Sequence, residues 1–322
     1  MSKHFNLNES FNLQFHAEGD PEVNLITSDL MAKAREVDFV TRFSDGILGK
    51  LLEALGVTRK IPMQEGTTLY TYTTEGALNA NTSVDEGAVI PLSKYERKKT
   101  AAGQITLRKV RKATSAEAIV RSGYDEAVRR TDEGMLNDLQ KLIRDDFFTF
   151  LTGIVRPASG TEGQSGYVPA VGVSVSGDTL QAVLAQSWAQ LQVLFENDAI
   201  EAVHFINPLT VADYLSTATI TTQTAFGMRY IEDFLGMGTV ILTSQIPKDE
   251  IYSTAKENLI LYYLAMNGDV ARSFNLTTDE SGYIGIHTSQ TDNRAQIETL
   301  MMTGISFLVE YTGGVVKGTV GA

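Results

Sequence analysis

The stretch from Tyr124 to Leu151 constrains the fold more than any other part of the chain. Apolar residues such as Leu136, Leu139 and Ile143 recur there at three- and four-residue steps, while acidic and basic residues occupy the opposite side. This period predicts one amphipathic helix. At about 1.5 Å per residue the helix would be about 42 Å long. A rod of that length is expected to lie across a surface, with one face in contact with a neighbour.

Signals on the N-terminal side of this helix predict where it starts. Thr114 and Glu117 have the spacing of a capping box, and Gly123 predicts a break or bend in the first turns. Further upstream, apolar residues one turn apart predict a short helix over 42–56 that ends at Gly56.

A hairpin is expected between these helices. The run TTLYTYTT at 67–74 consists almost entirely of strand-forming residues, a turn-rich segment follows at 79–87, and a second extended run begins at 88. Pro91 restricts that second run to an edge or irregular strand. Because two strands with weakly apolar faces are not stable alone in water, the hairpin is expected to be ordered by a surface that it lies against.

Positive charge is concentrated in one short part of an acidic chain. Eight lysines and arginines lie between Lys94 and Lys112 with a single acid, Glu96, whereas the whole chain has a net charge of −12. Direct binding of nucleic acid is one interpretation, but Tyr95 is the only aromatic residue in the stretch, and the acidic remainder would repel a polyanion. An acidic partner, such as another copy of this chain, fits better. A solvated strand without a partner stays open as a third interpretation.

The remaining sequence predicts a mixed α+β domain. A Gly- and Ser-rich loop over 152–176 ends in an alternating strand, a helix is expected over 178–196, and short strands then alternate with helices. The last forty residues have the composition of strands. The fold class expected is therefore α+β, with a hairpin, a long helix and a compact mixed domain.

Composition limits the classes of protein that the chain can belong to. It has 322 residues and no cysteine, which excludes disulfides and thiolate metal sites and favours folding in a reducing cytosol. The first twenty residues lack an apolar signal region, and the longest apolar stretch, at 259–266, is too short to span a bilayer. We expect a soluble protein made inside the cell, with no membrane association.

No catalytic, cofactor or metal site is expected. The four histidines are scattered without a metal-ligand spacing, and His204 is interpreted as a core residue. The segment SDGILGK at 44–50 lacks the first glycine of a phosphate loop, and GTEGQSG at 160–166 is interpreted as a surface loop. The chain is therefore expected not to be an enzyme.

The order of these parts, together with four local runs, resembles a known family. The runs are EGAVIPLSKYERKK at 86–99, the segment 112–151, FINPLTVADYL at 205–215 and the segment 234–259. They resemble corresponding segments of the major capsid proteins of tailed bacteriophages, which have the Hong Kong 97-like fold. The resemblance covers essentially the whole chain.

The resemblance implies a division of the chain into the parts of that fold. These would be an N-terminal arm (1–35), a short helix (36–57), an extended β-hairpin loop (58–113), a peripheral domain with the spine helix (114–176 and 283–303) and an axial domain (177–282 and 304–322).

It also implies a function. The chain would assemble with itself into pentamers and hexamers of an icosahedral shell that encloses double-stranded DNA without sequence-specific binding. Its partners would include a separate scaffolding protein, a portal and a decoration protein, and the virion capsid would form in the bacterial host cytoplasm. An encapsulin-type nanocompartment shell of the same fold is the alternative, and a soluble enzyme of unknown reaction is a third hypothesis.

The resemblance turns the charge pattern into an expected intersubunit contact. The basic stretch would meet acidic residues on the long helix of a neighbour. No covalent cross-link is expected, although some members of the family cross-link through a lysine of this loop. The residues expected at the contact are Lys94, Arg97, Lys98, Lys99, Arg108, Lys109, Arg111 and Lys112 on the basic side, and Asp132, Glu133, Asp138, Asp145 and Asp146 on the acidic side.

Overall fold

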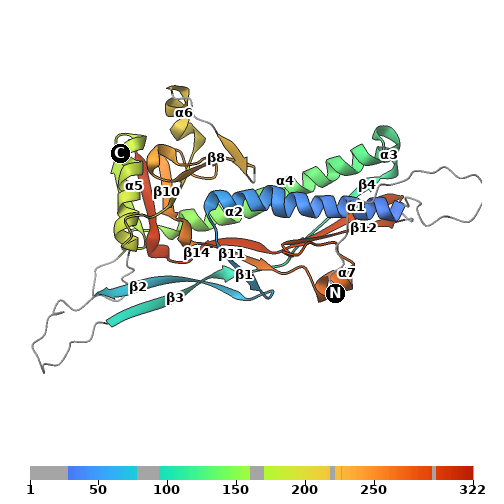
Figure 1. Cartoon of the computed structure of the whole chain (residues 1–322), viewed down its shortest axis with the longest axis horizontal. Helices are drawn as coiled ribbons and strands as arrows, with labels where there is room; N and C mark the ends of the chain where they lie inside the picture. The colour runs from blue at the N-terminus through green and yellow to red at the C-terminus, as the bar shows by residue number, and fades with distance from the viewer. Residues whose placement is uncertain are drawn as a thin grey trace, which may run out of the picture.

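A computed structural model describes residues 28–77, 94–159, 170–217, 222–225, 227–291 and 295–321. The predicted arm before residue 28, the hairpin tip at 79–87 and the Gly-rich loop at 160–166 lie outside this part. Figure 1 shows an elongated molecule in which helix α4 runs beside the N-terminal helices and a compact sheet domain lies at one end. The class is mixed α+β, as expected.

Helix α4 (Tyr124–Ile154) is the predicted long helix and extends three residues beyond the expected end. Its buried face includes Met135, Leu139 and Leu151. The short helix α3 (Ala116–Ser122) precedes it, and the two are separated at Gly123, whose φ of 83° breaks the helical path as predicted. The capping residue was assigned wrongly by one position. Ser115 caps α3 by accepting a bond from the amide of Ala118, because Thr114 is drawn away to the hydroxyl of Thr131.

The N-terminal helix is longer than predicted. Helix α1 (Ser28–Thr41) continues through the π-helical segment η1 (Arg42–Gly49) into α2 (Lys50–Leu55), which ends at Gly56 as expected. The predicted short helix is therefore the second part of a longer helix that starts at Ser28. Its first part has little apolar periodicity. Phe39 and Val40 are buried in the core, and Arg35 and Glu36 also make polar contacts with Thr277 and Thr288, which a local pattern does not reveal.

A seven-stranded mixed sheet forms the compact domain. Its strand order is β5-β15-β10-β6-β9-β8-β7, and strand β15 from the C-terminus lies between β5 and β10. Helix α5 packs against β5, β15 and β10. The strands are β5 (Val173–Gly177), β6 (Ala202–Ile206), β7 (Gln223–Ala225), β8 (Met228–Ile231), β9 (Thr239–Leu242), β10 (Glu250–Ala255) and β15 (Val315–Val320), and the helices are α5 (Leu180–Phe195), α6 (Pro208–Thr217) and the 3-10 turns η2 (Phe234–Gly236), η3 (Lys256–Asn258) and η5 (Thr312–Gly314).

Two three-stranded sheets lie along the rest of the molecule. One has the order β1-β11-β14 and the other β12-β13-β4. Phe147 of α4 packs edge-to-face against Phe205 of β6 and Phe307 of β14, and Phe148 packs in the same way against Phe205. The long helix therefore shares one core with the compact domain and the first of these sheets. The strands are β1 (Arg59–Met63), β4 (Arg108–Ser115), β11 (Leu259–Leu264), β12 (Ile284–Thr291), β13 (Gln296–Thr303) and β14 (Ile305–Val309), and the short helix α7 (Asp269–Phe274) follows β11.

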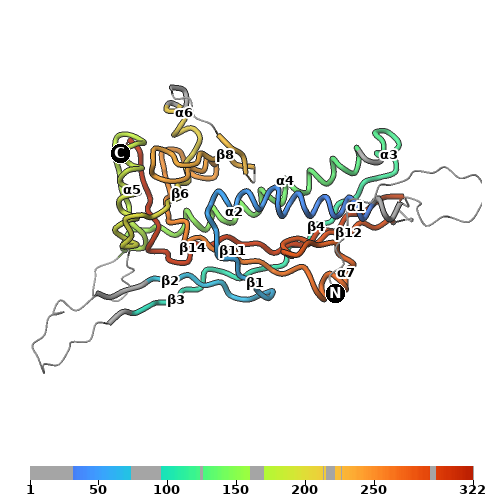
Figure 2. Tube along the Cα trace, viewed as in Figure 1, coloured from blue at the N-terminus to red at the C-terminus, as the bar shows by residue number. Residues whose placement is uncertain are grey.

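The predicted hairpin is present as a sheet of its own. Strands β2 (Thr68–Ala77) and β3 (Lys94–Gln104) form a two-stranded sheet, and a single bridge joins Tyr72 of β2 to Tyr311 of the body. Figure 2 shows the two strands leading away from the body. No helix in the described residues is both long enough and apolar enough to cross a membrane.

The resemblance placed residues 58–113 in one extended β-hairpin loop, but the structure divides the basic stretch between the hairpin and a second sheet. Ile105, which is almost fully buried, separates two different strands. Lys94, Arg97, Lys98 and Lys99 lie on β3 of the hairpin, whereas Arg108, Lys109, Arg111 and Lys112 lie on β4, where β4 pairs with β13. The part of the predicted extended loop that follows residue 107 thus belongs to the sheet beside α4.

Candidate functional site

One side of strand β4 is bonded to helix α4 of the same chain. Arg108 forms an ion pair with Asp146, and the ammonium group of Lys112 lies 2.8 Å from a carboxylate oxygen of Asp138. Four strand residues span about 13 Å and eight helix residues about 12 Å, so the spacings of the two pairs match. This match between 108/112 and 146/138 was present in the sequence and could have indicated the contact.

The other side of β4 carries Lys109 and Arg111. Arg111 forms an ion pair with Glu298 of the neighbouring strand β13, and that carboxylate is buried. Lys109 is exposed and forms no ion pair with a described residue. Of the four basic side chains on β4, three are therefore paired within their own chain.

The basic residues of β3 lie beside tyrosines of β2. The ammonium group of Lys99 is 3.5 Å from the centre of the Tyr70 ring, and the guanidinium of Arg97 is 3.9 Å from the centre of the Tyr72 ring. Such cation–π contacts stabilise by about 0.5–1 kcal/mol at exposed sites. Lys98 is exposed beside them, and Lys94 is in register with Ala77 at the outer end of the described hairpin.

The acidic residues predicted at the contact also have partners in their own chain. Glu133 lies 2.7 Å from Arg129, and Asp145 accepts a hydrogen bond of 2.5 Å from Gln245. Asp132 differs from the others because it is buried. Arg35 lies 3.3 Å from one of its oxygens, and the other oxygen makes no hydrogen bond with a described residue. Burial raises the pKa of Asp132 to about 6, against the opposing charge of Arg35.

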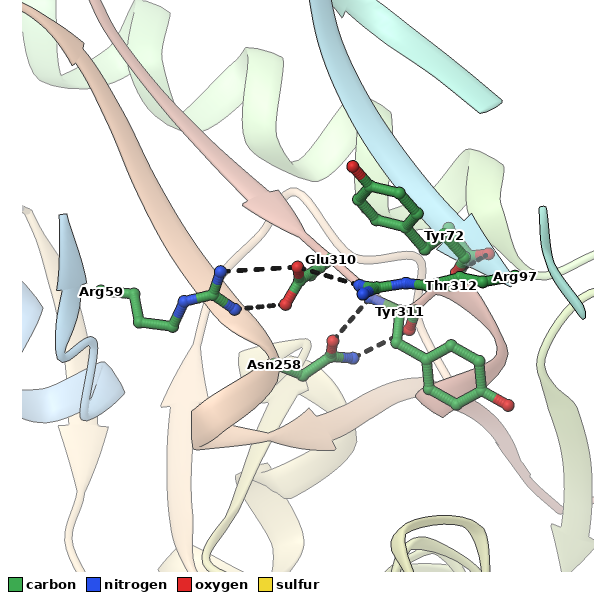
Figure 3. Close-up of polar contacts among 7 residues, drawn as sticks. All are labelled: Arg59, Tyr72, Arg97, Asn258, Glu310, Tyr311 and Thr312. Atoms are coloured by element: carbon green, nitrogen blue, oxygen red, sulfur yellow. Dashed lines mark hydrogen bonds and ion pairs between the residues drawn. The ribbon is translucent and has the colours of Figure 1, made fainter. Parts of the chain in front are cut away.

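A polar cluster that the sequence did not predict lies at the root of the hairpin (Figure 3). Glu310, at the end of β14, pairs through both oxygens with Arg59 of β1 and lies 3.2 Å from Arg97 of β3. The hydrogen bond from Arg59 is the main cause that lowers the pKa of Glu310. One carboxylate thus joins three strands that are far apart in the sequence, and no local pattern marks it.

Hydrogen bonds that involve the backbone also join the root of the hairpin to the body. The amide of Tyr72 donates a hydrogen bond of 2.7 Å to the carbonyl of Glu310. The buried side chain of Asn258 accepts a bond from the amide of Tyr311 at 2.7 Å and donates one to its carbonyl at 2.9 Å. The segment to which the hairpin is attached is therefore itself fixed to the body.

The described residues give no catalytic arrangement. They contain no group of three or more His, Asp or Glu side chains arranged to hold a metal ion. His204 is fully buried as a core residue, 2.7 Å from the hydroxyl of Ser253, and burial lowers its pKa to about 4. A cavity of about 520 Å³ beside α2 has a mixed lining of acidic and apolar residues, and its lysine, Lys256, pairs with Glu201.

Comparison of the whole structure with solved structures identifies the fold. No protein-family model and no curated protein sequence matches the chain. The capsid protein of cyanophage A-1(L) superposes with a TM-score of 0.51 at 9% sequence identity, over 85% of this chain and 93% of the other. This chain has the Hong Kong 97-like capsid fold.

Two further structures are similar over most of their length. A virus-like particle from Pyrococcus furiosus gives a TM-score of 0.46 at 14% identity, covering 90% of this chain and 99% of that one. The SrpI encapsulin from Synechococcus elongatus gives 0.43 at 11% identity, covering 95% and 92%. Shell proteins with the Hong Kong 97-like fold are structural proteins and not enzymes. The long helix α4 corresponds to the spine helix of the fold.

Proposed function

We propose that this chain is the major capsid protein of a tailed bacteriophage, which assembles with itself into pentamers and hexamers of an icosahedral shell around double-stranded DNA. The observation that carries the proposal is the similarity to the cyanophage A-1(L) capsid protein over nearly the full length of both chains. The hairpin also supports it, because a two-stranded sheet is at best marginally stable alone in water and a neighbouring subunit would supply a surface for it.

Within this proposal the helices and sheets are assigned to the peripheral domain, the axial domain and the extended loop. The peripheral domain contains α4 with the sheet β12-β13-β4, and the axial domain contains the seven-stranded sheet. The extended loop is shorter than the sequence indicated, because β2 and β3 leave the body whereas β4 belongs to the sheet beside α4. A separate scaffolding protein, a portal and a decoration protein are the proposed partners, and the shell would form in the cytoplasm of the bacterial host.

An encapsulin-type nanocompartment is the second candidate. One observation favours keeping this candidate: the alignment with the SrpI encapsulin covers 92% of the encapsulin chain. The two candidates differ in what the shell contains and not in how the chain folds.

Electron microscopy of particles purified from the native source tests the proposal. We expect closed icosahedral shells that contain DNA and have one vertex occupied by a portal. Shells that are filled with protein and have no portal would favour the nanocompartment, and small oligomers that never close would contradict both candidates.

The predicted intersubunit contact of the basic stretch needs a test that leaves the subunit itself intact. Reversal of Arg97 or Lys112 would break contacts within the chain, so Lys109→Glu is the sharper variant. We expect Lys109→Glu to reduce the yield of closed shells. The thermal unfolding midpoint of the subunit should stay unchanged, because Lys109 is exposed and forms no ion pair with a described residue of its own chain.

Lys60→Glu is the matched control, because Lys60 is also an exposed lysine on a strand but lies outside the basic stretch. A normal yield of shells from Lys109→Glu, or an equal loss from Lys60→Glu, would contradict a specific contact at Lys109. Yield is measured by sedimentation of assembled particles.

A further inference from the structure

The hairpin is joined to the body as far out as Tyr72 on β2 and Arg97 on β3. At this point the main chain of Tyr72 bonds to Glu310, and the hydroxyl of Thr312 lies 3.5 Å from the carbonyl of Tyr72. Beyond it the two strands continue in register to Ala77 and Lys94. The direction of the whole projecting part is therefore decided by a few contacts at its root.

Glu310 is the residue on which these contacts converge. Its side chain forms ion pairs with Arg97 on the hairpin and with Arg59 on the body, so the two guanidinium groups contact the same carboxylate (Figure 3). Arg97 is also packed on the ring of Tyr72, which bonds Glu310 through its backbone. These contacts hold both strands of the hairpin. They oppose rotation of the hairpin about its long axis as well as bending at its root.

The anchor for this carboxylate is rigid. The amide of Glu310 donates to the carbonyl of Asn258 at 3.0 Å, and Asn258 is buried. Its side chain bonds both backbone groups of Tyr311 and also the hydroxyl of Thr254, which in turn donates to the carbonyl of Gly314. Side chains held by packing and hydrogen bonds have little freedom to turn. Glu310 therefore holds the hairpin in a fixed position relative to the body.

We infer that Glu310, acting with Arg59 and Arg97, is the positioning residue that sets the direction in which the hairpin leaves the subunit, and that this direction is required for a second copy of the chain to be engaged during shell assembly. The assembly part of this inference rests on the proposed function. The positioning part concerns one subunit and is measured independently of any shell.

Spin-label distances within one subunit test the positioning. The chain has no cysteine, so Glu96→Cys on β3 and Val193→Cys on α5 introduce two exposed label sites without competing thiols. The doubly labelled full chain is diluted with unlabelled chain, so that double electron–electron resonance reports only distances within a subunit. We expect one narrow distance distribution for the chain with Glu310 and a broader, shifted one for Glu310→Gln.

Two further variants make the result specific. Arg97→Gln keeps the pair between Arg59 and Glu310 and still frees the hairpin, so it serves if Glu310→Gln does not fold. Glu250→Gln removes a comparable pair with Lys317, 2.6 Å long and between β10 and β15, and is expected to leave the distribution unchanged.

Assembly is measured on the same variants by sedimentation and electron microscopy. Loss of closed shells in Glu310→Gln and Arg97→Gln, but not in Glu250→Gln, is expected. An unchanged distance distribution in the first two variants would overturn the inference, and so would normal shells formed by variants with a broadened distribution. If the unaltered chain forms no shells, the proposed function fails, while the distance distribution still decides whether Glu310 positions the hairpin.

Discussion

Gly238→Ala is expected to destabilise the protein more than an alanine substitution at any other described glycine. Gly238 has a φ of +118°, and a β-carbon there would lie 2.2 Å from the carbonyl oxygen of Ala202 and 3.0 Å from its carbonyl carbon. These atoms are backbone, so they cannot move aside as a side chain would. The strained φ and the displaced strand β6 together predict a loss of about 3 kcal/mol or more in the free energy of unfolding.

Gly236→Ala is the matched control, two residues away. Gly236 also has a positive φ, of +74°, but among the described residues no heavy atom outside its immediate neighbours lies within 4 Å of the added carbon. Only the conformational cost remains, which is about 1 kcal/mol. Urea unfolding of both variants, followed by circular dichroism, measures the difference. Equal losses would show that the approach of Gly238 to β6 is not close in the folded protein.

Asp132→Asn is expected to stabilise the protein at neutral pH and to leave its stability nearly unchanged in acid. Asp132 is buried against Arg35, and burial raises its pKa from 3.8 to about 6. The folded protein therefore binds this proton more tightly than the unfolded chain does. The contribution to stability is complete below about pH 4 and is lost as the pH rises through about 6.

Asparagine stays neutral throughout and resembles the protonated acid. The shift corresponds to about 2 kcal/mol of differential stability between pH 4 and pH 7.5, to order of magnitude. Arg35 loses its counter-charge in the variant, but it keeps its hydrogen bond of 2.8 Å to the hydroxyl of Thr288. Urea unfolding of both proteins at the two pH values measures the effect.

Asp138→Asn is the control on the same helix and should behave in the opposite sense. Asp138 is exposed, and the hydrogen bond from Lys112 lowers its pKa, so its charged form is favoured by folding and is lost only in acid. If Asp132→Asn has a lower free energy of unfolding than the unaltered protein at pH 7.5, then burying the charge of Asp132 has no net cost and the prediction is wrong.

Local patterns were sufficient for most of the helices and strands. The helix from Tyr124 is long because apolar residues keep their period over many turns, and Gly123 interrupts it because glycine adopts a φ that other residues avoid. The hairpin followed from β-forming residues around a turn-rich tip. By contrast, the first part of the N-terminal helix was missed because it has little apolar periodicity. Phe39 and Val40 are buried in the core, and the buried Glu36 bonds Thr277 and the amide of Thr288, a contact that leaves no local pattern.

The interpretation of the charged residues shows the limit of reasoning from sequence. The composition of the stretch from Lys94 to Lys112 was read correctly as positive, and acids on the long helix were named as its partners. The structure pairs Arg108 and Lys112 with Asp146 and Asp138 in the same chain, and whether other members of the stretch meet a neighbouring subunit stays a prediction. Charge alone does not distinguish a partner in the same chain from one in a second copy.

The sequence by itself determined most of the elements of this protein and their order, because helical and strand periods depend on neighbours a few residues apart. Only the tertiary structure divided the basic stretch between two strands and brought Arg59, Arg97 and Glu310 together, since these residues are separated by up to 251 positions. Contacts between such distant positions are made by the packing of whole sheets. The hairpin was visible in the sequence, and the residue that positions it was visible only in the fold.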